Sequence, residues 1–168
     1  MYEWKLIYKG PIPGKTLKGK NLGRMYKAGY WELGVHWHAN MAAGHFTAEG
    51  GKKYGYAKRK GEGAARPQYY KRSYAYRKRR TKGHADPLVW TGKSRSLAKR
   101  RHVVATSKGC KTYIHAPALN RRHPKSRVNM RAEMTRVTTG EAHALGKVFT
   151  RSADRSLKSF RRKMKIRP

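Results

Sequence analysis

The sequence predicts an α+β fold in which a long N-terminal helix and a C-terminal helix pack on a small antiparallel sheet. Two stretches, 21–49 and 138–160, repeat apolar residues every three or four positions, the period of an amphipathic helix. Between them, two short β-prone runs flank a glycine-containing turn, a pattern typical of a hairpin. Cations also crowd into residues 52–83, which predicts an extended basic arm beside the packed elements.

One domain, residues 1–168, is expected, because this length suits a single domain of ordinary size. Around its helices and sheet we expect an N-terminal strand and loop (1–20), a basic Tyr-rich arm (52–83) and a basic tail (161–168).

A short strand is predicted at the N-terminus. Aromatic and aliphatic residues alternate with Glu3 and Lys5 over residues 2–8, which is the period of a half-buried strand. The Gly- and Pro-rich segment 10–14 then ends the strand.

The main helix is predicted over residues 21–49. Asn21 is expected to cap its N-terminus, and Gly50 with Gly51 to end it. The apolar stripe of this helix consists of Leu22, Met25, Tyr26, Tyr30, Leu33, Trp37 and Met41.

The arm, residues 52–83, interleaves tyrosines with lysines and arginines, and Glu62 is its only acid. Its first half is rich in Gly and Lys, which predicts a loop or an extended arm. Residues 68–80 are expected to form a short helix.

A buried turn is predicted at 87–92, where a short apolar run ends in Thr-Gly. Residues 94–101 are expected to form one or two helical turns around Leu97. The hairpin follows, with strands over 103–106 and 110–114 and a Ser-Lys-Gly turn between them.

A basic, proline-containing loop is predicted over 116–128, and a strand over 130–134. Thr138 and Glu141 then have the spacing of a capping box, which predicts that the last helix begins there. The helix ends in the basic residues 161–165, which suit the negative end of its dipole. Its apolar face consists of Ala142, Leu145, Phe149, Ala153, Leu157 and Phe160.

The charge of the chain is its most informative bulk property. It has 42 Lys and Arg against 8 Asp and Glu, a formal net charge of +34. Self-repulsion at this charge favours a nucleic acid or acidic protein partner, and no apolar run is long enough to span a membrane. Leu, Ile, Val and Phe make up only about 14% of the residues, so the chain is expected to be ordered largely within an assembly.

Two sets of residues are candidates for contacts with partners. The candidates for packing between copies of the chain are Trp37, Trp90, Leu145 and Phe149. The candidates for contact with a polyanion or an acidic partner are Lys58, Arg59, Lys60, Lys71, Arg72, Arg77, Lys78, Arg79, Arg80, Lys82, Arg100, Arg101, Arg121, Arg122, Arg161, Arg162 and Lys163.

No catalytic or metal centre is expected. His36, His38 and His45 are the candidate metal ligands, but His36 and His38 do not share a helix face and no cysteine lies nearby, so packed or surface histidines are the favoured interpretation. The eight acids are spread along the chain, which disfavours acid–base catalysis by a carboxylate pair. No serine lies in a nucleophile elbow and no glycine-rich phosphate loop is present, so we expect neither a cofactor nor an enzyme.

Several short motifs, in this order, resemble a known group of proteins. They are Val35-His36-Trp37-His38, His45-Phe46, Tyr54-Gly55-Tyr56-Ala57-Lys58-Arg59, Tyr70-Lys71-Arg72, Pro87-Leu88-Val89-Trp90-Thr91-Gly92-Lys93-Ser94, Arg122-His123-Pro124-Lys125 with Asn129-Met130, and Val137-Thr138. Over most of residues 20–158 the chain resembles the neck, tail-completion and virion-morphogenesis proteins of tailed bacteriophages. Their broader pattern is a long N-terminal helix, a PLV-x-TG turn, a hairpin and a C-terminal helix.

The resemblance implies a mechanical role in the virion, without catalytic residues. Copies of the chain would form a ring at the head–tail junction, assembled in the host cytoplasm. The implied partners are acidic portal, adaptor or tail proteins, with DNA held through non-specific phosphate contacts. The chain departs from the pattern of these phage proteins at residues 93–101, which are mainly basic. In that pattern an apolar-rich helix often follows the Thr-Gly turn.

Two other interpretations stay open at this point. A ribosomal-type RNA-binding protein would have the same basic composition and extended arm, and would order on RNA. A more distant possibility is a nuclease or other metal enzyme that uses His36, His38 and His45.

Overall fold

The computed structural model describes residues 2–4, 20–57, 71, 73–89, 92–120 and 128–165 of the chain. These residues group into two compact units, each built from separate stretches of sequence. Unit 1 contains residues 1–39, 101–113 and 139–168, and unit 2 contains residues 40–100 and 114–138. The chain passes between the units four times, so neither unit is one continuous stretch of sequence. The expectation of a single domain over residues 1–168 therefore stays a prediction.

Unit 1 contains a three-stranded antiparallel sheet of order β1-β3-β2. The predicted hairpin is confirmed: β2 (Val103–Ala105) pairs with β3 (Cys110–Thr112). The predicted N-terminal strand is present as β1 (Tyr2–Trp4), which pairs with the other edge of β3. In both hairpin strands the outer two residues are buried and the middle residue is more exposed, as period-2 alternation requires.

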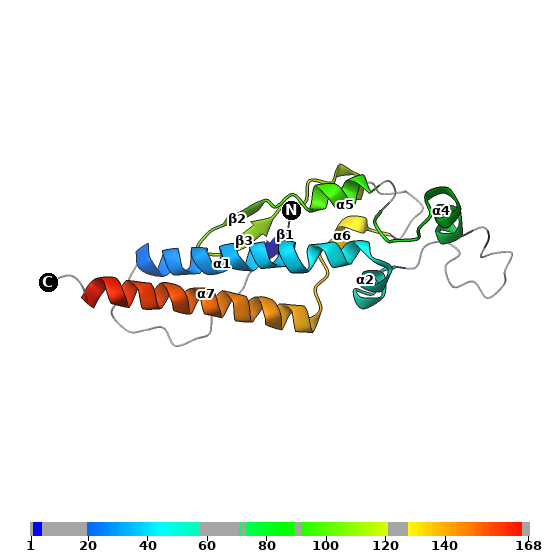
Figure 1. Ribbon diagram of the computed structural model, residues 1–168. Coiled ribbons are helices and arrows are strands. Elements are labelled where there is room, and N and C mark those ends of the chain that lie inside the picture. Colours follow the sequence, from blue (N-terminus) through cyan, green and yellow to red (C-terminus); the bar gives the residue numbers. More distant parts are fainter. Residues whose placement is uncertain are drawn as a thin grey trace. The chain divides into compact units, whose positions relative to one another are not determined.

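The long helix α1 (Lys20–Asn40) packs on two sides in unit 1. Gly29 faces the ring of Phe149 on α7 (Thr139–Lys165), where an added Cβ would lie 2.8 Å from the ring. Gly34 faces the sheet, where an added Cβ would lie 2.6 Å from Cγ1 of Val103. Figure 1 shows this arrangement, with α7 alongside α1 and the hairpin on the other side of α1.

The two long helices share an apolar core. Met25 of α1 clusters with Ala153 and Leu157 of α7, and all three are buried. Tyr30 packs its ring 4.9 Å from that of Phe149. The helices therefore pack together and on the antiparallel sheet, as the sequence predicts, and α7 begins one residue after the expected cap Thr138.

Unit 2 is built from short helices. They are the 3-10 helices η1 (Ala42–Phe46) and η2 (Pro117–Asn120) and the α-helices α2 (Ala48–Lys53), α4 (Tyr74–Lys82), α5 (Lys93–Ala98) and α6 (Met130–Met134). Both α5 and α6 contact η1 and η2, and α2 packs on η1.

Two side chains near α6 hold the segment that follows α2. The guanidinium of Arg136 donates to the carbonyl oxygens of Tyr54, at 3.0 Å, and Gly55. Glu133 is buried and accepts a hydrogen bond from the backbone N–H of Ala57 at 3.1 Å. These contacts satisfy backbone groups in a stretch without regular structure.

The single helix predicted over 21–49 is wrong beyond residue 40. The chain leaves α1 at Asn40, forms η1, and starts α2 with Thr47, whose hydroxyl accepts from Gly50 N–H at 3.0 Å. Gly50 lies so close to Gly44 that a Cβ there would overlap the Gly44 carbonyl. This close approach requires the break, so Gly50 and Gly51 lie inside α2 instead of ending a helix.

Other local predictions also need correction. Residues 130–134 form helix α6 and not a strand, because the Asn129 side chain caps the N–H of Ala132 at 3.1 Å. Asn21 lies inside α1, one residue past its start, and is not its cap. In the basic arm, Lys52 and Lys53 end α2, residues 54–57 form a turn and an irregular stretch, and α4 covers Tyr74–Lys82. Residues 58–70 and 72 lie outside the described residues.

Candidate partner-binding site

The described part of the basic arm is organised on α4. Ser73 caps this helix by accepting a hydrogen bond from Tyr76 N–H at 3.0 Å, and Gly83, with φ 73°, ends it. Four of the predicted contact residues on α4 are exposed: Arg77, Arg79, Arg80 and Lys82. A capped helix thus holds a dense set of cations at the surface of unit 2.

Lys78 is an exception among these cations and corrects the prediction. Its side chain is 1% exposed, and its ammonium donates to the backbone carbonyl of Asp86. The ammonium also lies 5.4 Å from the centroid of the Tyr74 ring. Lys78 therefore fixes α4 to the segment around Asp86 and does not present its charge at the surface.

A second basic stretch follows the Thr-Gly turn. Lys93 and Arg95 of α5 are exposed, as are Lys99 and Arg100 after it. Arg101, which belongs to unit 1, is exposed too. Of these five cations, only Arg100 and Arg101 are among the predicted contact residues.

Unit 2 contains a hollow of about 980 Å³ between α2, α4, α5 and η2. Its floor is aliphatic and includes Leu88, Leu97, Leu119 and Met130. Leu88 is buried and has a φ of 57°, a left-handed conformation that is rare for a branched side chain. Tertiary packing therefore holds Leu88 in a strained backbone at the floor of the hollow.

The rim of the hollow is cationic. Lys52 of α2, Arg79 of α4 and Lys93 of α5 line it, and all three side chains are exposed. No aspartate or glutamate occurs among the described residues that line the hollow. The combination can hold an apolar side chain on the floor and carboxylates or other anions at the edge.

The candidate metal ligands do not form a centre in the described parts of the chain, where no three His, Cys, Asp or Glu side chains are grouped to hold an ion. His45 is fully buried and stacks on Tyr54, with ring centroids 3.9 Å apart and planes 4° from parallel. Its Nδ1 lies 2.5 Å from the hydroxyl oxygen of Tyr56. His45 is thus part of an aromatic stack in the interior of unit 2.

The residues predicted to pack between copies of the chain need correction. Trp37, Leu145 and Phe149 are each 1% exposed, because they face inward from the long helices. Phe149 packs against Gly29 and Tyr30 of the same unit. These three residues stabilise the chain's own interior and offer no surface to a second copy, while Trp90 lies outside the described residues.

The remaining predicted contact residues differ in how far the structure describes them. Lys71 is described and exposed. The C-terminal basic residues belong to the last turns of α7, and only their backbone is described: Arg161, Arg162 and Lys163. The predicted contacts outside the described residues are Lys58, Arg59, Lys60, Arg72, Arg121 and Arg122.

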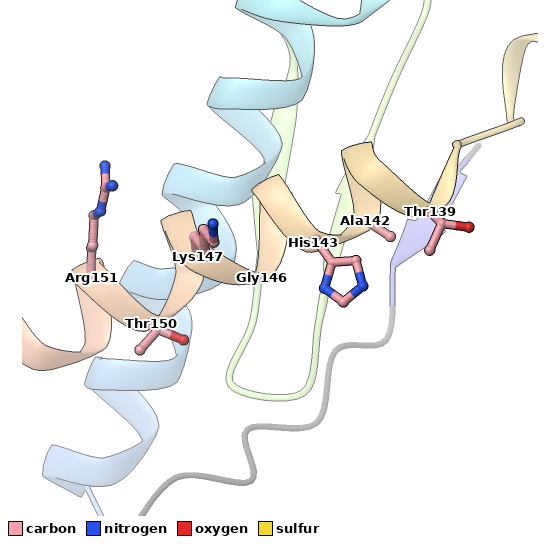
Figure 2. A pocket seen from close by; sticks show the side chains of 7 residues that line it. All are labelled: Thr139, Ala142, His143, Gly146, Lys147, Thr150 and Arg151. Atoms are coloured by element: carbon pink, nitrogen blue, oxygen red, sulfur yellow. The ribbon is translucent and has the colours of Figure 1, made fainter. Parts of the chain in front are cut away.

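A shallow groove of about 620 Å³ follows one face of α7 (Figure 2). Small residues and cations alternate along it, from Thr139 through Gly146 to Arg151. All described lining residues come from this single helix face, and an added Cβ at Gly146 would meet no atom within 4 Å. The groove is therefore an open helix surface and not an enclosed pocket.

Sequence reasoning missed the hollow of unit 2. Its walls come from six separate stretches between residues 48 and 130, and no single motif brings them together. The one available signal was the apolar run at 87–89, which was correctly predicted as buried: Leu88 and Val89 are 8% and 5% exposed.

Comparison of the chain with protein-family models, with curated proteins and with solved structures finds no match. Among the described residues, no helix is both long and apolar enough to cross a membrane.

Proposed function

We propose that this chain is a structural protein of a tailed-phage virion, a ring subunit of the neck or of the tail-completion region. The observation that carries the proposal is the basic surface of unit 2, where Arg77, Arg79, Arg80 and Lys82 are held on a capped helix beside the cationic rim of the hollow. Such a surface suits strong, non-catalytic contact with acidic partners.

The order of elements also supports the proposal. A long helix, a buried turn at 87–89, a hairpin and a second long helix occur in the order that the resemblance to neck and tail-completion proteins implies. The two long helices bury their apolar faces within the chain, so unit 1 has its own core and can serve as the frame of a subunit.

The mass of the purified protein in solution tests this function. We expect a defined, salt-stable ring by light scattering at both low and high salt, without nucleic acid. The alternative, a ribosomal-type RNA-binding protein, predicts a monomer that gains order only when RNA is added, and this result would exclude the ring. Because phosphate contacts weaken steeply with salt, RNA binding would also disappear at the higher salt.

A further inference from the structure

We propose that the hollow of unit 2 docks an acidic segment of a different protein, which inserts an apolar side chain between the cations of the rim. This inference rests on the proposed function in one respect only, which is the location of the partner in a virion. The contact itself depends on the size, floor and rim of the hollow.

The size and floor suit an inserted side chain. A volume of about 980 Å³ lies at the upper end of the range of ligand pockets, and it has room for more than one side chain. Leu97 and Met130 are only half-buried, so apolar area stays open to an occupant. Met130 also adapts readily to different shapes because its side chain is unbranched.

The rim selects the charge of the occupant. Lys52, Arg79 and Lys93 line the hollow from three different helices, and all three are exposed, so their charges can act on an occupant. Lys78 also lines the hollow, but its buried ammonium is bound to the Asp86 carbonyl, so the exposed charge of the rim comes from the other three cations. With no carboxylate among the described lining residues, an acidic occupant gains attraction that a neutral one lacks.

The chain itself cannot supply such a segment. Its eight acids are isolated, and the closest pair, Glu133 and Glu141, is eight residues apart. A second copy has the same sequence and offers nothing better. The chain's own segment 58–70 contains Lys58, Arg59, Lys60 and Arg66 against Glu62 alone, so the rim would repel it. The occupant is therefore a segment of another protein.

A nucleic acid fits the hollow less well. Phosphates pair with surface cations, but the floor of Leu88, Leu97 and Leu119 offers them no donor, and a polar group buried there without partners costs free energy. Single-stranded bases are usually held by stacking on exposed aromatic rings. The two tyrosines that line the hollow, Tyr56 and Tyr74, are half-buried, with Tyr56 stacked on Tyr54 and Tyr74 beside the Lys78 ammonium. An acidic peptide with an apolar anchor uses both the floor and the rim.

Fluorescence anisotropy with three labelled probes tests the proposal on the full chain at physiological salt. The first probe is a short peptide in which Asp and Glu surround a Leu and a Phe, and the second replaces Leu and Phe by Ser. The third is a single-stranded oligonucleotide of equal charge. We expect the first probe to bind at least about tenfold more tightly than the second, the loss of roughly one buried apolar side chain.

Two matched pairs of charge reversals locate the site. Arg79→Glu and Lys93→Glu alter the rim, whereas Arg80→Glu and Lys99→Glu make the same change at exposed cations that do not line the hollow. We expect the rim pair to weaken the apolar acidic peptide about tenfold or more and the control pair less than about threefold. Leu97→Ala should weaken that peptide but leave the Ser peptide unchanged.

Three results would overturn the proposal. One is an equal loss of peptide affinity in the rim pair and the control pair, which would mean that the net charge of the chain alone determines binding. Another is that the rim substitutions weaken binding of the oligonucleotide but not of the apolar acidic peptide. The third is tighter peptide binding after residues 58–70 are replaced by a Gly-Ser linker, which would mean that this segment fills the hollow. A protein that binds the peptide through the rim but stays monomeric would retain the docking site and lose the proposed function.

Discussion

Gly34→Ala is predicted to destabilise the protein, although alanine normally favours a helix over glycine by about 1 kcal/mol. The new Cβ would lie 2.6 Å from one methyl of Val103 and 3.3 Å from the other, and 3.3 Å from the methyl of Thr112. Val103 and Thr112 are buried and β-branched, so neither side chain can rotate away freely. Overpacking of this kind costs about 1–3 kcal/mol, so after the gain in helix propensity we expect a net loss of up to about 2 kcal/mol.

Gly23→Ala is the matched control in the same helix. Its Cβ would meet only Ser107 Cβ, at an ordinary 3.7 Å, so we expect it to stabilise the protein by up to about 1 kcal/mol. Urea unfolding followed by circular dichroism, at one fixed high salt concentration, measures the free energy of unfolding of both variants. Adding Val103→Ala to Gly34→Ala should recover part of the loss, because it removes the methyl groups that clash. Equal stabilisation by Gly34→Ala and Gly23→Ala would refute the close packing of α1 on the sheet.

Three further predictions concern single positions. Gly50→Ala should unfold α2 and its surroundings, since its Cβ would overlap the Gly44 carbonyl, whereas Gly51→Ala, at 3.4 Å from Pro87, should be tolerated; limited proteolysis distinguishes them. Thr112→Val should raise the free energy of unfolding by about 1 kcal/mol, because the buried Thr112 hydroxyl has no hydrogen-bond partner among the described residues; a loss would mean that the hydroxyl is paired. Burial raises the pKa of the Cys110 thiol from 9.0 to about 11, so Ellman's reagent should label it at pH 8 only after unfolding. The unfolded thiol ionises first, so stability should fall more between pH 9 and pH 11 than it does in Cys110→Ala, and equal pH slopes would contradict the assignment.

Local signals explain which elements could be predicted. The hairpin is encoded by β-prone residues on both sides of a glycine turn, and the start of α7 by Thr138 and Glu141, so neither depends on distant contacts. The break after Asn40 was not predictable in this way. It depends on Gly50 packing against the backbone of Gly44, whereas the apolar period continues through Met41.

In the candidate site, too, features encoded by local sequence were predictable, and features that depend on distant contacts were not. The cations of α4 were predicted from composition, but the helix was expected over 68–80, whereas Ser73 and Gly83 bound it at Tyr74–Lys82. The burial of Lys78 was not predictable, because its partner is a backbone carbonyl, that of Asp86, which no side-chain pattern reveals. The hollow depends on tertiary packing of six stretches, and only its apolar floor at Leu88 and Val89 left a trace in the sequence.

Quantitative mass spectrometry of purified phage particles tests the central claim most directly. If the chain is a ring subunit of the neck or tail-completion region, its peptides should occur at a fixed, low ratio to the major capsid protein. That ratio should persist after a high-salt wash that removes nucleic-acid-bound contaminants. Absence of the chain from intact particles, or its loss in the wash, would contradict the account.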